Sequence, residues 1–269
     1  MPEALSALQI STRQPGVAQV TMARPAVFNA FDEAMIAELD AAFLSLGADD
    51  AVRVIVLAGA GPHFSAGADL QWMQRASGAS LEWNVDDARR FASMMARVQQ
   101  CPKPTVARLQ GAALGGGVGL ACACDIAVAA DNATFAVSEL KFGILPSVIG
   151  PYLIHAVGTR QAQRLALTAA RIDAAQALQI GLVHSVAPLA ELDAALDQTV
   201  AALLAAGPQA QRELKLLFSR LSTFPAGPVS PEVRELCAQT IARMRGSDEA
   251  REGFAAFLGK RPPTWTAQP

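Results

Sequence analysis

Apolar and polar positions alternate in two short runs near the start of the chain, LSALQISTR and GVAQVTMA, which flank Gln14-Pro15-Gly16. A period of two predicts strands, and the Pro-Gly pair between them predicts a hairpin. A third run, VRVIVLAGA, is almost continuously apolar and β-branched. Such a run predicts a strand that is buried on both faces, as in a parallel sheet.

Helical spacing alternates with these runs. EAMIAELDAAFLSL has apolar residues three and four apart, and Asp32 stands where an N-cap would. Further helices are expected from about Leu70 to Gln100. The order of strand, glycine turn, helix and strand predicts an α/β fold. After Pro104 the runs expected to form strands are TVARLQ, CDIAVAA and ATFAVSEL, with a helix directly after the glycines between the first two.

From about Thr159 to Leu258 the pattern is mostly helical, apart from the short strand-like run LVHSVA. This helical part is amphipathic, and only 17% of all residues are charged while 52% are apolar. That balance favours apolar surface buried between subunits, so an oligomer is expected.

Charge and composition narrow the class of partner. The formal net charge is −2 and no Lys/Arg cluster is present, which argues against nucleic acid and anionic membranes and for a small molecule. Three histidines and four cysteines are scattered, so no metal site is expected. The N-terminal sequence has no basic region followed by an apolar run, and no uninterrupted apolar stretch reaches ~18 residues, so the protein is expected to be cytoplasmic.

The stretch GAALGGGVGLACACDIA, residues 111–127, poses a question of chemistry. Its glycines fit neither G-x-G-x-x-G nor G-x-x-x-x-G-K-[ST], so a phosphate cradle is not supported. A helix that begins at glycine presents unpaired backbone N–H groups. A second turn, FSAGADL, offers more, because Gly67 bends the chain and the N–H groups of Ala68 and Asp69 would begin the next helix. Two such donors can hold an oxyanion, each contributing ~3 kcal/mol, or both turns serve only tight packing.

Together with their neighbours, these turns resemble the enoyl-CoA hydratase/isomerase (crotonase) family almost from end to end. The resemblance implies an α/β spiral of ββα units that binds acyl-CoA and carries the catalysis, assigned to residues 1–200. It also implies a helical C-terminal oligomerisation region, residues 201–269, that forms trimers or hexamers. Coenzyme A is part of the substrate, so no separate cofactor is implied. The matching segments are MARPAVFNAF, HFSAGADLQWM, residues 103–146, IDAAQALQIGLVHSVAP and EGFAAFLGKRPPTW.

The resemblance also implies roles for single residues. The N–H groups of Ala68 and Gly116 would form the oxyanion hole, and Glu139 would transfer the proton. The apolar sequence around Glu139 predicts a raised pKa for its carboxyl. The residues that would hold the substrate and its CoA moiety are Arg24, Ala26, Val27, Phe28, Ala66, Ala68, Asp69, Leu70, Gln71, Gly115, Gly116 and, reaching a neighbouring subunit's CoA, Phe257 and Lys260.

One family feature is missing, because a second glutamate of typical hydratases would stand at Gly119. The finer resemblance is to bacterial 3-methylglutaconyl-CoA hydratases of leucine breakdown and isohexenylglutaconyl-CoA hydratases, a subgroup that also lacks this glutamate. Such a substrate carries a distal carboxylate, for which the candidate cations are Arg75, Arg89, Arg90 and Lys141. Hydration is the first expectation. An enoyl-CoA isomerase that uses a single glutamate and a non-catalytic acyl-CoA-binding subunit are the alternatives.

Overall fold

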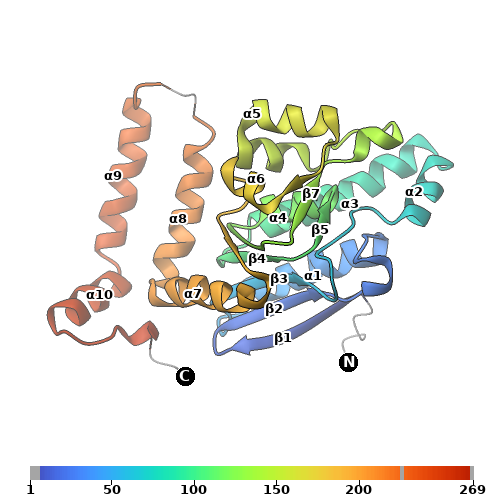
Figure 1. Cartoon of the computed structure of the whole chain (residues 1–269). Helices are drawn as coiled ribbons and strands as arrows, with labels where there is room; N and C mark the ends of the chain where they lie inside the picture. The colour runs from blue at the N-terminus through green and yellow to red at the C-terminus, as the bar shows by residue number, and fades with distance from the viewer. Residues whose placement is uncertain (1–6, 225–226, 267–269) are drawn as a thin grey trace.

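Two sheets form the centre of the computed structural model, which describes residues 7–224 and 227–266 (Figure 1). The strands are β1 (Leu8–Gln14), β2 (Val17–Met22), β3 (Val54–Gly59), β4 (Thr105–Leu109), β5 (Ala112–Leu114), β6 (Ile126–Ala130), β7 (Thr134–Ala136), β8 (Ile172–Asp173) and β9 (Ser185–Ala187). The larger sheet has the order β1-β2-β3-β4-β6-β9, and the smaller one has the order β5-β7-β8. Both sheets are mixed, because β1 is antiparallel to β2 and β8 to β7, while the other neighbours are parallel.

The helices follow the predicted order. They are α1 (Glu33–Ala48), α2 (Leu70–Ser77), α3 (Leu81–Gln99), α4 (Gly116–Ala123), α5 (Gly150–Thr168), α6 (Ala174–Gln179), α7 (Leu192–Ala205), α8 (Pro208–Leu221), α9 (Pro231–Arg245) and α10 (Asp248–Leu258). Short 3-10 helices are η1 (Pro25–Val27), η2 (Glu139–Phe142), η3 (Leu189–Glu191) and η4 (Thr264–Thr266). The predicted cap of α1 is confirmed, because the Asp32 carboxylate accepts from the Met35 N–H at 2.9 Å.

The predicted hairpin and the predicted buried strand are confirmed. β1 and β2 pair around a turn at Gly16, whose φ of +76° lies in the left-handed region that favours glycine. The expected first strand began at Leu5, and Leu5 and Ser6 lie outside the described residues. All six residues of β3 are buried between parallel neighbours.

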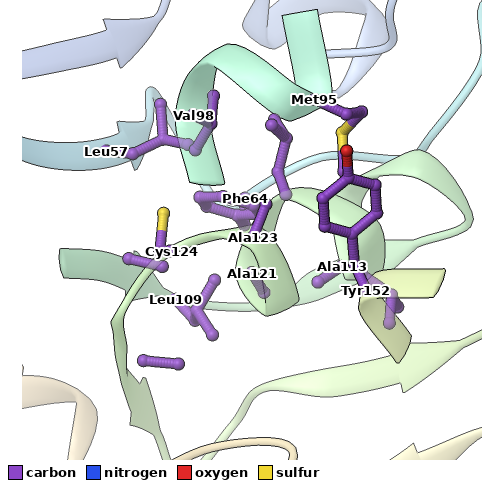
Figure 2. Close-up of a cluster of buried hydrophobic side chains, with 14 of the residues drawn as sticks. Leu57, Phe64, Met95, Val98, Leu109, Ala113, Ala121, Ala123, Cys124 and Tyr152 are labelled. Atoms are coloured by element: carbon purple, nitrogen blue, oxygen red, sulfur yellow. The ribbon is translucent and has the colours of Figure 1, made fainter. Parts of the chain in front are cut away.

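The alternation within β3 divides the interior into two clusters. Val54 and Val56 face α7, which supplies Leu192, Leu196 and Val200 to a smaller core. Residues 55 and 57 face the main core, where α1, α3 and α4 cover the sheet. Figure 2 shows part of this main core, with Leu57, Phe64, Met95, Val98 and Leu109 among its labelled side chains. Each such side chain contributes roughly 1.5–3 kcal/mol when buried.

The predicted spiral of ββα units is present. β4, β5 and α4 form one unit, and β6, β7 and α5 form the next. Two details differ from the prediction. β5 precedes α4 in a segment where no strand was expected, and β7 ends at Ala136, so the end of ATFAVSEL lies in η2. Both strands have three residues, too few for an alternating pattern to reveal.

The last helices are set apart from the sheets, with α9 and α10 farthest from the body (Figure 1). Neither α8 nor α9 buries a residue within its own chain, and Leu214, Leu216, Phe218 and Ile241 are exposed on them. An unpacked apolar face of this kind is typical of a subunit contact. The boundary drawn after residue 200 falls inside α7, which packs on the sheet. Over the parts of the chain that the structure describes, no helix combines the length and apolarity that crossing a membrane requires.

Candidate active site

A cavity of about 960 Å³ opens beside the two glycine turns. Its wall is made by η1, the turn at residues 66–69, α2, the first turn of α4 and residues 138–149. Most lining side chains are apolar. Its titratable lining residues, among those described, are Arg24, Asp69 and Glu139.

The two glycine turns pack directly against each other. A Cβ at Gly67 would lie 2.8 Å from the carbonyl oxygen of Leu114, and the φ of Gly67 is +87°. Gly115, at the start of α4, has a φ of +49°. The Leu114 N–H donates to the Ser65 carbonyl at 2.9 Å, which ties the two turns together. Both turns therefore need glycine for backbone conformation, and the first also needs it for close approach.

Each turn leaves backbone donors free. The Gly115 N–H donates to Ala136 at 2.8 Å and the Asp69 N–H donates to Phe31 at 2.7 Å. Next to these bonded groups, the N–H groups of Ala68 and Gly116 donate to no acceptor in the described parts of the chain. Gly116 is the first residue of α4, where the helix dipole is positive. The turns thus provide tight packing and free donors at once. The expectation that Asp69 supplies a free donor is wrong, because its N–H group donates to Phe31. Asp69 is instead the N-cap of α2, which begins at Leu70.

Glu139 lies beside the second turn. It begins η2, and a Cβ at Gly115 would lie 3.0 Å from its Oε1. Its Oε2 is buried without a hydrogen-bond partner. Burial raises the pKa of the Glu139 carboxyl, and the backbone N–H groups of Ser138 and Glu139 oppose this in part. The predicted raised pKa is confirmed. A carboxyl with one unbonded oxygen, in the same cavity as two free N–H groups, can exchange a proton with a bound substrate.

The space expected for a second glutamate is filled. Gly119 is buried in α4, and a Cβ there would overlap with Cγ2 of Ile149 and lie 2.8 Å from its Cβ. Met95 Cε lies 3.2 Å from the same point. Ile149, which is 2% exposed, lines the cavity. Sequence reasoning missed Ile149, because nothing in the chain marks a residue 30 positions downstream as the neighbour of Gly119.

Arg24 joins the ends of two helices. Its guanidinium contacts Asp32, the N-cap of α1, at 2.9 Å and Asp69, the N-cap of α2, at 3.3 Å. It also donates to the carbonyl of Ala30 at 2.7 Å. Asp69 in turn accepts from the N–H groups of Gln71 and Trp72. Two residues predicted to hold CoA are therefore ion-paired with each other at the cavity wall.

The other predicted binding residues fall into two groups. Those that line the cavity are Ala26, Val27, Phe28, Ala66, Ala68, Leu70, Gln71, Gly115 and Gly116. Phe257 and Lys260 do not line it. Phe257 is 84% exposed near the end of α10, and Lys260 follows that helix with a φ of +49°. Within one chain they therefore have no contact with the site.

The wall of the cavity next to Gly116 is aromatic, because a Cβ at Gly116 would meet the rings of Phe31 and Phe91. Trp72, Phe91 and Phe31 form an aromatic group with ring centroids 6.1 and 6.5 Å from Phe91. Sequence reasoning did not single these residues out, because apolar residues at helical spacing look like ordinary core. The four candidate cations do not line the cavity. Arg75 pairs with Glu33, Arg89 with Asp86 and Arg90 with Asp87, and Lys141 is exposed.

Comparisons with known proteins identify the family of the chain. Residues 12–268 match the family model described as Enoyl-CoA hydratase/isomerase. The chain is similar to the crystal structure of an enoyl-CoA hydratase from Shewanella pealeana, with 39% identity, a TM-score of 0.92 and coverage of 98% of this chain and 97% of that one. It is similar to Pseudomonas aeruginosa AtuE, with 37% identity, a TM-score of 0.91 and coverage of 97% and 100%. It is also 33% identical to the 2,3-dehydroadipyl-CoA hydratase of Escherichia coli, over 94% of this chain and 96% of that protein.

Proposed function

Because the chain belongs to the enoyl-CoA hydratase/isomerase (crotonase) family and is an enoyl-CoA hydratase, a hydro-lyase, we propose that Glu139 carries out its proton transfer without a second carboxylate. Its fold is the crotonase fold, with two mixed sheets and C-terminal helices, as the sequence predicted. The supporting observation is Glu139 itself, whose Oε2 is buried without a hydrogen-bond partner in the same cavity as the two free backbone donors.

The backbone donors fix where the thioester would lie. The N–H groups of Ala68 and Gly116 donate to the thioester carbonyl oxygen and stabilise the negative charge that develops there. The oxygen of water bonds to C3, and one water proton ends on C2. Glu139 handles that proton, because its carboxylate accepts it from water and its carboxyl then gives it to C2. The glutamate thus ends the cycle in the state in which it began.

The direct test is Glu139→Gln, assayed by loss of the conjugated enoyl-thioester absorbance. We expect kcat to fall by about two orders of magnitude or more, because general acid–base catalysis contributes that much. Glu82→Gln, at an exposed position of α3 outside the cavity wall, is the control. A Glu139→Gln variant that keeps the wild-type rate would refute the proposal.

A second activity is favoured by the same lone carboxyl. Moving a proton between C2 and C4 of an enoyl thioester requires one base, and Ile149 fills the place of a second. An isomerase activity would be measured as a gain of conjugated absorbance from a 3-enoyl-CoA. The non-catalytic alternative is set aside, because the chain is an enoyl-CoA hydratase.

For the substrate, we propose an enoyl-CoA with an alkyl branch at C3, of which 3-methylglutaconyl-CoA is the predicted example. The apolar wall of Trp72, Phe91 and Ile149 supports the branched part. The E. coli relative is named for an acyl group with a terminal carboxylate. In this chain Arg24 is paired and the four candidate cations lie elsewhere, so such a carboxylate would meet hydroxyls, for example that of Ser147. A panel of crotonyl-, 3-methylcrotonyl-, 3-methylglutaconyl- and 2,3-dehydroadipyl-CoA separates the contributions of branch and carboxylate.

We also propose that residues 201–269 join copies of the chain into trimers or hexamers. The apolar faces of α8 and α9, which bury nothing in their own chain, support this. Phe257 and Lys260 would then reach a neighbour's CoA. Sedimentation together with activity across a dilution series tests both, and a monomer with full activity would contradict both.

A further inference from the structure

The starting observation is the contact between Ile149 and Gly119. A Cβ at Gly119 has no room, because the obstructing atoms include the Cβ of Ile149 at 2.8 Å and not only the flexible end of a side chain. Ile149 is the N-cap of α5 and is 2% exposed, so it cannot move aside into solvent. The position is closed to any side chain while Ile149 keeps its place.

Ile149 and Glu139 are carried by one segment and contact consecutive turns of α4. The Glu139 carboxyl lies next to Gly115, and Ile149 lies over Gly119, four residues later. Residues four apart on a helix lie about 5–6 Å from each other on the same face. The Gly116 N–H, between them in sequence, is the donor assigned to the thioester oxygen. The reacting carbons therefore lie between a carboxyl and a branched apolar side chain.

We propose that Ile149 is a specificity-determining residue, which closes the place of a second carboxylate and presents an apolar wall to an alkyl branch at C3 of the acyl group. This rests on the proposed function. The branch would pack against the Ile149 side chain, which is buried and lines the cavity. An unbranched substrate leaves this apolar wall uncovered. Ile149 thus favours branched over unbranched enoyl thioesters.

The first test is the ratio of kcat/KM for 3-methylcrotonyl-CoA to that for crotonyl-CoA. Discrimination by one methyl group in an apolar pocket is about 10–200-fold. We expect Ile149→Ala to lower the ratio by about tenfold, and Ile154→Ala, at an exposed position of α5 outside the cavity wall, to leave it unchanged. A ratio in Ile149→Ala equal to that of the wild type would overturn the inference.

The second test measures the thermal unfolding of Gly119→Ala, of Ile149→Gly and of the double variant that carries both substitutions. We expect Gly119→Ala to lower Tm by about 5 °C, because overpacking costs stability. Ile149→Gly removes the obstructing Cβ, so the double variant should melt higher than the sum of the two single shifts predicts. Strict additivity of the shifts would contradict the steric argument and with it the inference.

The two proposals fail separately. If Glu139→Gln abolishes hydration while Ile149→Ala leaves the ratio unchanged, the proposed function stands and the role of Ile149 is wrong. If Glu139→Gln keeps the wild-type rate, the proposed function itself is wrong.

Discussion

Replacing Arg24 with methionine tests whether the guanidinium serves the fold or the ligand. Arg24→Met keeps an unbranched apolar stem and removes two ion pairs, at 2.9 and 3.3 Å, and one bond to a carbonyl at 2.7 Å. The three side chains of this group are 14% to 24% exposed. Breaking a fully buried pair costs about 3–5 kcal/mol. Because this group is partly exposed and both carboxylates keep backbone donors, we expect about 2–3 kcal/mol.

The expected loss converts to a measurable shift. With an unfolding entropy of about 2.1 cal/mol/K per residue, a chain of 269 residues loses about 3.5–5 °C in Tm for 2–3 kcal/mol. The matched control is Arg75→Met, because Arg75 pairs with Glu33 at 2.8 Å but is 57% exposed. An exposed pair contributes about 0–1 kcal/mol, so its loss should shift Tm by less than about 2 °C.

The assay is thermal unfolding at one protein concentration, with KM for an enoyl-CoA measured in parallel. If Arg24 joins the caps of α1 and α2, Tm falls while KM changes little. If instead Arg24→Met melts like Arg75→Met while KM rises tenfold, the guanidinium serves the CoA moiety and the reasoning from ion pairs is refuted.

Three further outcomes are expected. Burial raises the pKa of Glu139, so the stability that this group contributes is present below its ordinary pKa of 4.5 and is lost as pH rises through its folded-state pKa. Glu139→Gln should therefore raise Tm at pH 8 and not at pH 4. An equal shift in Tm at both pH values would contradict this. Gly67→Ala should lower Tm and reduce kcat more than it raises KM, because it moves the Ala68 donor. The control is Gly78→Ala, where a Cβ would have no atom nearer than 3.8 Å, and it should change neither Tm nor kcat. Equal effects of the two variants would count against the strained turn. Burial raises the pKa of the Cys124 thiol, so a thiol reagent should modify this residue only after unfolding, and rapid modification of Cys124 in the native protein, located by mass spectrometry, would show otherwise.

Patterns that act over a few residues made most of the fold predictable. Alternation identified β1 and β2, continuous β-branched sequence identified β3, and Asp32 marked the start of α1. β5 was not predicted, and the end of β7 was placed too late in the sequence. A three-residue strand is determined by its partners in the small sheet rather than by its own sequence.

The site was predictable where backbone chemistry decides it. Glycines before α4 and at the turn of residue 67 indicated free N–H groups, and Ala68 and Gly116 are free in the structure. The ion pairs of Arg24 and the contact of Ile149 with Gly119 could not be predicted, because both depend on which distant residues the fold brings together. A charge or a branched side chain looks the same in sequence whether it faces a ligand or a neighbour.

The contact between Ile149 and Gly119 also constrains the order in which this site could change during evolution. A first substitution at residue 119 meets a closed position and costs stability before it can improve catalysis. A first substitution at residue 149 opens space that nothing yet uses. A lineage with this pair therefore reaches a two-carboxylate site by changing residue 149 first, so the packing of the single-glutamate site opposes the gain of a second carboxylate.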